Sequence, residues 1–387
     1  DWGAWAEVGM ASRGSVPRLM AYAGIDMLPP ALGAALLRDE LLYGEGGEVV
    51  LAGSLGLLEA PRQPNHGLDV ARADAALRSG TPAHTMFSHL TGMDQTGEIF
   101  LEAILDPNEQ AFLKDHSLNG VPILPGVIGI EGFSIAARHV ASALAATSGR
   151  FELERLEAVN FLSPFKFYRN QPRSILWQAR AVREASGLVV YVSLQSEQSM
   201  VDKRIERTLH FTGTGILTKT LPQTGPVQAP KWGKRSTVSA EEIYRLYFHG
   251  PSFQVLEAAQ RSGKVVLGRL NKEIGRVKTG KTDRLSVPML VELCFQTAGI
   301  WEVGATGVLA LPHSIGSLRV YRNTINGKAV YAEVRPQQTE SGPRFDCRVV
   351  DEEGNVYLEM LDYRTSPMPY PADAALAAPF KQLVDEG

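Results

Sequence analysis

One histidine stands among residues that could hold it still beside a binding site for a negatively charged oxygen. His116 is followed by Gly120, which reaches backbone conformations closed to other residues, and by Pro125, which favours a helix start. The apolar helix predicted after it offers free N–H groups at Gly126 and Val127 to a carbonyl or an oxyanion. A base beside such a site is what removal of a proton next to a thioester carbonyl requires. A polar loop histidine would be the alternative interpretation.

A second segment, 287–303, predicts another apolar helix and carries a carboxylate. Glu292 and Gln296 are four residues apart and therefore lie on one helical face. A carboxylate on an apolar face is costly without a role, and burial favours its neutral form. We therefore expect Glu292 to be a protonated acid at working pH. A buried glutamate paired with Gln296 or an arginine would give the same pattern.

These two segments resemble the motifs of dehydratase domains in polyketide synthases and related multienzyme fatty acid synthases. Residues 116–125 match the His-x-x-x-Gly-x-x-x-x-Pro motif of that family. Residues 288–296 match its Pro-x-Leu-Leu-Asp-x-x-x-Gln motif, with Glu292 in place of the usual aspartate. The change keeps a carboxylic acid and adds one methylene group.

A third segment lies between them and resembles the family's Gly-Tyr-x-Tyr-Gly-Pro-x-Phe motif. Tyr247 matches the first tyrosine, and His249 stands where the second tyrosine usually stands. His249 is expected to donate a hydrogen bond to the leaving hydroxyl or to substrate, or to be only a turn residue. The three motifs come in family order, and the resemblance covers residues 85–366.

The resemblance implies dehydration of a 3-hydroxyacyl thioester on acyl carrier protein to a trans-2-enoyl thioester. His116 would remove the α-proton, and Glu292 would protonate the leaving hydroxyl. Residues implied in support are Gln296, Gly126, Val127, His249 and Tyr247, and those implied for the substrate tunnel are Gly120, Pro125, Gly250, Pro251 and Phe253. The substrate would arrive on the phosphopantetheine of the carrier protein, with no metal or redox cofactor.

Composition is typical of a globular chain and excludes other classes. The 387 residues are 44% hydrophobic and 21% charged, and a net charge of −3 argues against a nucleic-acid-binding protein. Cys294 and Cys347 show neither metal-ligand spacing nor a disulfide framework, so we expect a reducing cytoplasm. No secretory signal or confident membrane span is predicted.

The N-terminal residues resemble a different domain of the same kind of multienzyme. Residues 1–58 are similar to the C-terminal end of a synthase ketoreductase domain, and 59–84 is predicted to be a linker with a possible short helix. The dinucleotide-binding loop and catalytic residues of a ketoreductase are missing. We therefore expect no ketoreductase activity from this segment.

The remaining pattern predicts an α+β protein built as a double hotdog fold. Each half reads as one long apolar helix, 126–146 and 287–303, followed by strands with alternating apolar positions. The predicted divisions are an N-terminal hotdog at 85–219, a linker at 220–238, a C-terminal hotdog at 239–366 and a tail at 367–387. The first half is predicted to supply His116 and the second to supply Glu292, because the active site of this fold lies between its two copies.

Two other functions stay open on the sequence alone. A hotdog acyl-thioesterase would use an activated water at the thioester instead of a base at the α-carbon. A catalytically degenerate dehydratase could act as a scaffold or dimerisation module, which the changes at His249 and Glu292 motivate. Partners implied by the resemblance are acyl carrier protein, the other domains of the synthase and a second copy in a homodimer, with no nucleic acid and no membrane.

Overall fold

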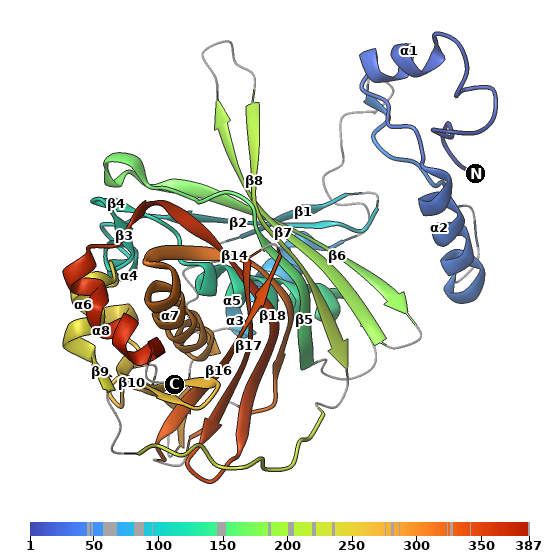
Figure 1. Ribbon diagram of the computed structural model, residues 1–387. Coiled ribbons are helices and arrows are strands. Elements are labelled where there is room, and N and C mark those ends of the chain that lie inside the picture. Colours follow the sequence, from blue (N-terminus) through green and yellow to red (C-terminus); the bar gives the residue numbers. More distant parts are fainter. Residues whose placement is uncertain are drawn as a thin grey trace.

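The computed structural model describes residues 1–44, 47, 49–56, 68–80, 89–94, 96–144, 152–184, 187–199, 205–218, 222–233, 237–274, 276–279, 282–285, 287–322, 324–325, 328–340 and 342–385. Two long helices, α5 (Gly126–Leu144) and α7 (Val287–Thr306), lie against one strongly curved sheet of thirteen strands (Figure 1). Both helices lie where the apolar runs predict them.

The first half wraps the α5 helix with six strands. Its elements are β1 (His89–Met93), β2 (Ile99–Leu105), α4 (Ala111–Lys114), β3 (Ser117–Leu118), β4 (Val121–Pro122), α5, β5 (Glu152–Phe161), η2 (Tyr168–Asn170), β6 (Arg173–Glu184), β7 (Gly187–Ser199) and β8 (Ile205–Thr218). Along β2 the buried residues Ile99, Leu101 and Ala103 alternate with more exposed ones. This period of two places one face of each strand on the helix.

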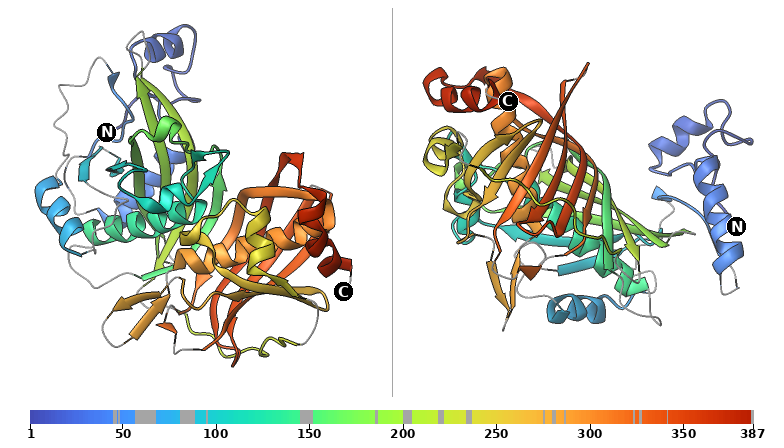
Figure 2. Two further views of the ribbon diagram at one scale, coloured as in Figure 1. Left: turned by 90° about the vertical axis from the view of Figure 1, so that its left-hand side faces the viewer. Right: turned by 60° about the horizontal axis from the view of Figure 1, so that its bottom comes forward.

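The second half repeats this plan around α7. Its elements are β9 (Thr237–Ser239), α6 (Ala240–Leu246), η3 (Pro251–Phe253), β10 (Leu256–Ser262), β11 (Val265–Leu270), β12 (Arg276–Thr279), β13 (Thr282–Leu285), α7, β14 (Val308–Val320), β15 (Thr324–Ile325), β16 (Val330–Thr339), β17 (Gly342–Asp351), β18 (Val356–Pro371) and α8 (Ala374–Asp385). The views in Figure 2 show the two helix-and-sheet units side by side.

The order of strands shows that the two halves are copies of one arrangement. From the centre outward the first half reads β5-β8-β7-β6-β2-β1, and the second reads β14-β18-β17-β16-β11-β10. β5 and β14 pair antiparallel at the centre, with Val159 opposite Ile315, so one sheet continues through both halves. This is the predicted pair of tandem hotdogs, and α5 and α7 take equivalent places in it.

Two glycines on α5 let large aromatic rings lie directly against the helix. A Cβ on Gly132 would be 2.2 Å from the Trp177 ring, and a Cβ on Gly129 would be 2.5 Å from the Phe211 ring. Trp177 is fully buried and packs edge-on against Phe133 of the same helix, with ring centroids 5.6 Å apart. The core of the first half therefore depends on small residues at these helix positions.

The segment 162–167 leaves the sheet after β5. β5 ends at Phe161, and the N–H of Leu162 then donates to the His210 carbonyl at 2.8 Å. Pro164 follows and has no N–H to extend the ladder. The chain instead turns toward the motif-bearing hairpin, where Lys166 forms an isolated β-bridge with Ile123.

Residues 1–56 form a small unit apart from the sheet (Figures 1 and 2). It contains α1 (Val16–Tyr22), α2 (Pro30–Tyr43) and two isolated parallel bridges, Trp2–Leu51 and Trp5–Leu28. Many of its large apolar side chains are exposed, among them Met10 and Tyr22. The ketoreductase resemblance of this unit stays a prediction.

Two further predicted divisions contain ordered elements. The predicted linker 59–84 contains α3 (Val70–Gly80), as the expected short helix, and its other residues before 68 and after 80 lie outside the described residues. The predicted tail 367–387 contains the end of β18 and helix α8, which packs on α7 through buried Phe380 and Leu383. No helix among the described residues is long and apolar enough to cross a membrane.

Candidate active site

His116 is presented by a tight hairpin after α4. Ser117 pairs with Pro122 across it, and the turn is Asn119-Gly120, with φ of 51° and 76°. Two successive positive φ values match the turn for which an Asn-Gly pair is favoured. Gly120 thus allows the tight hairpin, because glycine adopts the left-handed backbone of this position without strain.

The imidazole of His116 is fixed with one nitrogen available. Nδ1 lies 2.9 Å from the Ile123 carbonyl oxygen, and a carbonyl only accepts, so Nδ1 carries the proton and Nε2 keeps its lone pair. The N–H of Ile123 donates in return to the His116 carbonyl at 2.9 Å. Burial, and then the charge of His249, lower the pKa of His116 to about 4. The ring is therefore neutral near pH 7 and can accept a proton.

Glu292 is buried within α7 and is held by two donors. Gln296 Nε2 donates to its Oε1 at 2.6 Å, and His249 Nε2 lies 3.2 Å from the same oxygen. Burial raises the pKa of Glu292, but the hydrogen bond and charge of His249, the charge of His116 and the bond from Gln296 lower it further, below its usual range. The prediction of a neutral acid in the resting site is therefore wrong, because it considered burial without His249.

Gln296 is fixed by a set of hydrogen bonds from the second half. Its Nε2 also donates to the Phe253 carbonyl at 2.7 Å, and its Oε1 accepts from the Tyr244 hydroxyl at 2.8 Å. The Tyr244 oxygen in turn accepts from the Leu256 N–H at 2.7 Å. The Tyr247 hydroxyl donates to the Gln296 main-chain carbonyl at 2.9 Å. The amide therefore points its N–H group at the carboxylate without freedom to flip.

His249 joins the two halves of the site. It forms an isolated antiparallel β-bridge with His116, and the two ring centroids are 5.5 Å apart. Phe253 packs edge-on against His116 at the same centroid distance. His116 from the first half and the Glu292 carboxylate from the second half thus meet through His249, so the structure brings together the two residues that were expected from different halves.

Asp115 and Ser252 form a clamp between the two halves beside this bridge, and the sequence pattern does not predict it. The Asp115 carbonyl accepts from the Gly250 N–H at 2.7 Å, and its Oδ2 accepts from the Ser252 N–H at 2.9 Å and from the Ser252 hydroxyl. A Cβ on Gly250 would be 2.6 Å from Asp115 Oδ1, so only glycine fits. The only local sign of the clamp is the aspartate next to His116, because its partner Ser252 lies 137 positions away and no sequence pattern links the two.

The remaining predicted residues fall into two groups. Gly126 and Val127 are the first two residues of α5, and the first N–H groups that bond within this turn are those of Ile128 and Gly129, which donate to the Pro125 carbonyl. Among the described residues the N–H groups of Gly126 and Val127 have no backbone acceptor. Pro125 is buried and Phe253 is 1% exposed, whereas Gly120 and Pro251 are exposed. The tunnel assignment of these residues stays a prediction.

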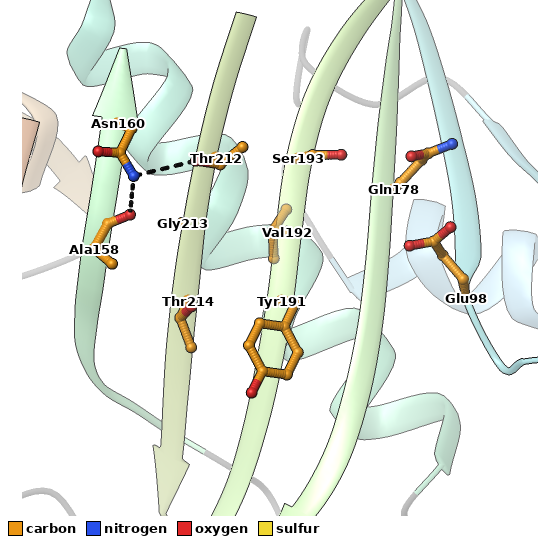
Figure 3. Close-up of a pocket in the computed structure, with 10 residues that line it drawn as sticks. All are labelled: Glu98, Ala158, Asn160, Gln178, Tyr191, Val192, Ser193, Thr212, Gly213 and Thr214. Atoms are coloured by element: carbon orange, nitrogen blue, oxygen red, sulfur yellow. Dashed lines mark hydrogen bonds between the residues drawn. The ribbon is translucent and has the colours of Figure 1, made fainter. Parts of the chain in front are cut away.

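The pocket in Figure 3 lies away from this chemistry. It has a volume of about 350 Å³ and lies over strands β5, β8, β7 and β6 of the first half, on the face turned away from α5. Polar side chains line it, including Asn160, Gln178, Ser193 and Thr212. It is an open hollow on the outside of the sheet and contains neither His116 nor Glu292.

Comparisons with known protein families match most of the chain. A model described as polyketide synthase dehydratase domain matches residues 84–194, and one described as polyketide synthase dehydratase N-terminal domain matches residues 225–375. Each covers one half of the double fold, and the two ranges contain all three motifs.

Individual relatives are a polyketide synthase and dehydratase domains of such synthases. The chain is 23% identical over 266 residues to polyketide synthase PksN of Bacillus subtilis (strain 168), covering 65% of this chain but only 5% of that protein. The dehydratase domain from the CurF module of curacin polyketide synthase has a TM-score of 0.57 at 17% identity, covering 74% of this chain and 100% of that chain. A trans-AT polyketide synthase dehydratase domain from Brevibacillus brevis has a TM-score of 0.56 at 19% identity, covering 74% and 99%. These structures share the double hotdog fold with this chain.

Proposed function

The chain belongs to the polyketide synthase dehydratase family, and from this premise we propose that it dehydrates a 3-hydroxyacyl thioester carried by acyl carrier protein. The product would be a trans-2-enoyl thioester and water. The proposal rests on one observation: His249 contacts both the neutral His116 and the carboxyl group of Glu292.

His116 is the base in this proposal. Its Nε2 takes the proton from the α-carbon, and the bond from Nδ1 to the Ile123 carbonyl keeps the lone pair in place. Removal of that proton places negative charge on the thioester oxygen. The N–H groups of Gly126 and Val127, at the positive end of α5, are the donors proposed to stabilise it.

The carboxyl group of Glu292 delivers the proton to the departing hydroxyl. Gln296 holds this carboxyl group in position by its 2.6 Å bond, and Tyr244 and Tyr247 hold Gln296. One proton leaves the substrate at the α-carbon and one joins the hydroxyl, so the reaction changes no net oxidation state. We therefore propose no redox cofactor. Because His116 and Glu292 supply both proton transfers, the proposal assigns no step to a metal, and phosphopantetheine enters as part of the substrate.

The partners follow from the carried substrate. Acyl carrier protein would deliver the thioester, and the other domains of a synthase would make and consume it. Residues 85–219 and 239–366 are proposed as the two hotdogs, joined by 220–238. A homodimer, a cytoplasmic location and a ketoreductase neighbour at 1–58 are retained as parts of the proposal that rest on resemblance.

Product analysis tests the function and separates the alternatives. The chain would be incubated with a 3-hydroxyacyl pantetheine thioester, and the products identified by mass. We expect loss of water in the native chain and no loss in H116A or E292Q, each shown to be folded by circular dichroism. A free acid would instead indicate a thioesterase, and no product from any 3-hydroxyacyl chain length would support a scaffold.

A further inference from the structure

The site contains two histidines and one carboxylate, although the proposed reaction names only one base and one acid. His249 occupies the place of a tyrosine in the related motif, and its Nε2 is 3.2 Å from Glu292 Oε1. We propose that His249 and Glu292 form one proton-bearing unit, in which His249 stores the proton that Glu292 passes to the leaving hydroxyl. This inference rests on the proposed dehydration.

The geometry holds His249 in the position that such a unit needs. Its main chain is fixed by the bridge to His116 and by the Gln254 side chain, whose Nε2 donates to the His249 carbonyl at 3.1 Å. Its ring stacks on Phe248 with centroids 4.4 Å apart. The main-chain contacts therefore fix the position of His249, and the stack on Phe248 restrains rotation of its ring away from the carboxylate.

The two ring nitrogens of His249 differ in a way that suits proton storage. Nε2 faces the Glu292 carboxylate, whereas Nδ1 is buried and has no hydrogen-bond partner among the described residues. In His116 the Ile123 carbonyl fixes the tautomer, so Nε2 always presents a lone pair. Within the described part of the chain no acceptor fixes the tautomer of His249 in this way. With a proton on Nδ1, its Nε2 can hold a second proton or hand it to Glu292.

The proton balance closes within these three side chains. At rest the pair holds one transferable proton: His249 is an imidazolium with protons on both ring nitrogens, and its Nε2–H faces the ionised Glu292 carboxylate. Transfer of the Nε2 proton leaves a neutral imidazole that keeps its proton on Nδ1. During reaction the Nε2 proton moves onto the carboxyl group and then onto the hydroxyl oxygen, while the C3–O bond breaks and its electrons leave with water. The electrons of the α-C–H bond form the new double bond, and His116 Nε2 takes that proton. Return of the proton from His116 to the pair, across rings 5.5 Å apart, restores the site.

A shared proton has a consequence for the pH dependence. The titratable groups that face His249 are Glu292 on α7, His116 and Asp115 on the opposing loop, and Tyr247 at the end of α6. Two coupled sites hold their last proton to a higher pH than either site holds it alone. The pair therefore keeps one transferable proton to a higher pH than Glu292 alone would keep its own, although that proton lies on His249 and the pKa of Glu292 itself is lowered.

The test replaces His249 by a residue that can donate a hydrogen bond but cannot store a proton. We would measure kcat/KM for dehydration between pH 5 and 10 in the native chain, in H249Q and in Y247F. On the basic side of the profile, we expect kcat/KM of H249Q to fall off at a pH about one unit or more below that of the native chain. Y247F removes a bond to the Gln296 main chain without touching the carboxylate, so its rate is expected to fall while the basic limb stays in place. A basic limb of H249Q that coincides with the native one would overturn the proposal.

A second measurement needs no turnover. Infrared difference spectra would follow the carbonyl band of protonated Glu292, identified by its loss in E292Q, during a pH titration. Without His249 the main cause that lowers this pKa is gone, so the band is expected to titrate at higher pH in H249Q than in the native chain. Equal titration midpoints of the Glu292 band in H249Q and in the native chain would refute the shared proton. If the native chain itself released no water, the proposed function would fail, and the infrared result would still decide the pairing.

Discussion

The replacement of Gly250 by alanine tests whether the contact between Gly250 and Asp115 positions His116, the proposed base. Gly250 has φ of −77° and ψ of −178°, which any residue can adopt, so the substitution introduces no backbone strain. Its Cβ would however lie 2.6 Å from Asp115 Oδ1 and 2.9 Å from both Asp115 Cα and Cβ, where 3.4–4 Å is ordinary contact. The neighbouring chain must therefore move by about half an ångström or more, because backbone and not a flexible side-chain end blocks the space.

This displacement falls on the residue directly before His116. Overpacking of this kind destabilises a protein by about 1–3 kcal/mol, and a shift of about 1 Å in a catalytic group reduces the rate about 10²-fold. We therefore expect G250A to remain folded, with kcat lowered by about 10²-fold and a modestly lower Tm. The measurement is steady-state dehydration of a 3-hydroxyacyl thioester together with thermal unfolding by circular dichroism.

A matched control is available in the same chain. A Cβ on Gly225 meets no atom within 4 Å and its φ is not left-handed, so G225A is expected to match the native protein in kcat and Tm. If G250A turned over within about threefold of G225A, the close approach to Asp115 would not position His116, and the argument from that contact would be refuted.

Other substitutions and conditions test separate parts of the structure. Because the pKa of His116 is lowered to about 4, the acid limb of kcat/KM should lie well below pH 6.5; a limb near 6.5 would show that the base is not buried as described. Between these values the unfolded chain binds the extra proton, so the unfolding free energy should decrease as pH falls through this window, as denaturant titrations would show. In a double-mutant cycle, D115A and S252A should give a coupling energy of about 1–3 kcal/mol in unfolding free energy, and additive effects would contradict the clamp. G132A should destabilise the first half by about 1–3 kcal/mol, because its Cβ would overlap the Trp177 ring; an unchanged Tm would contradict that packing.

The parts of this site that could be predicted from the sequence are those set by local pattern. The positive φ of Gly120 after His116 and the four-residue spacing of Glu292 and Gln296 are local features, and both appear as expected. The two helices follow from apolar runs long enough to be unambiguous. The strands follow from their alternation, except where Pro164 ends the ladder early.

The features that could not be predicted depend on contacts between distant residues. The charge state of Glu292 is set by His249, which lies on a loop 43 positions earlier and would pass for a turn residue. The Asp115–Ser252 clamp requires the docking of one half on the other, and no periodicity in the sequence encodes it. A pKa in such a site is a property of the assembled fold, so reasoning from burial on one helix gives the wrong sign.

The matched strand order of the two halves gives the molecule a near two-fold symmetry that its chemistry does not share. Glu131 is the sixth residue of α5, as Glu292 is the sixth residue of α7, so the symmetry provides two equivalent carboxylates. The segment that precedes α7 from residue 271 onward contains no histidine to match His116. Burial raises the pKa of Glu131, as expected for a carboxyl group without an imidazole neighbour. The two halves are thus alike in arrangement but differ in their titratable groups, and the proposed elimination uses only one of the two equivalent positions.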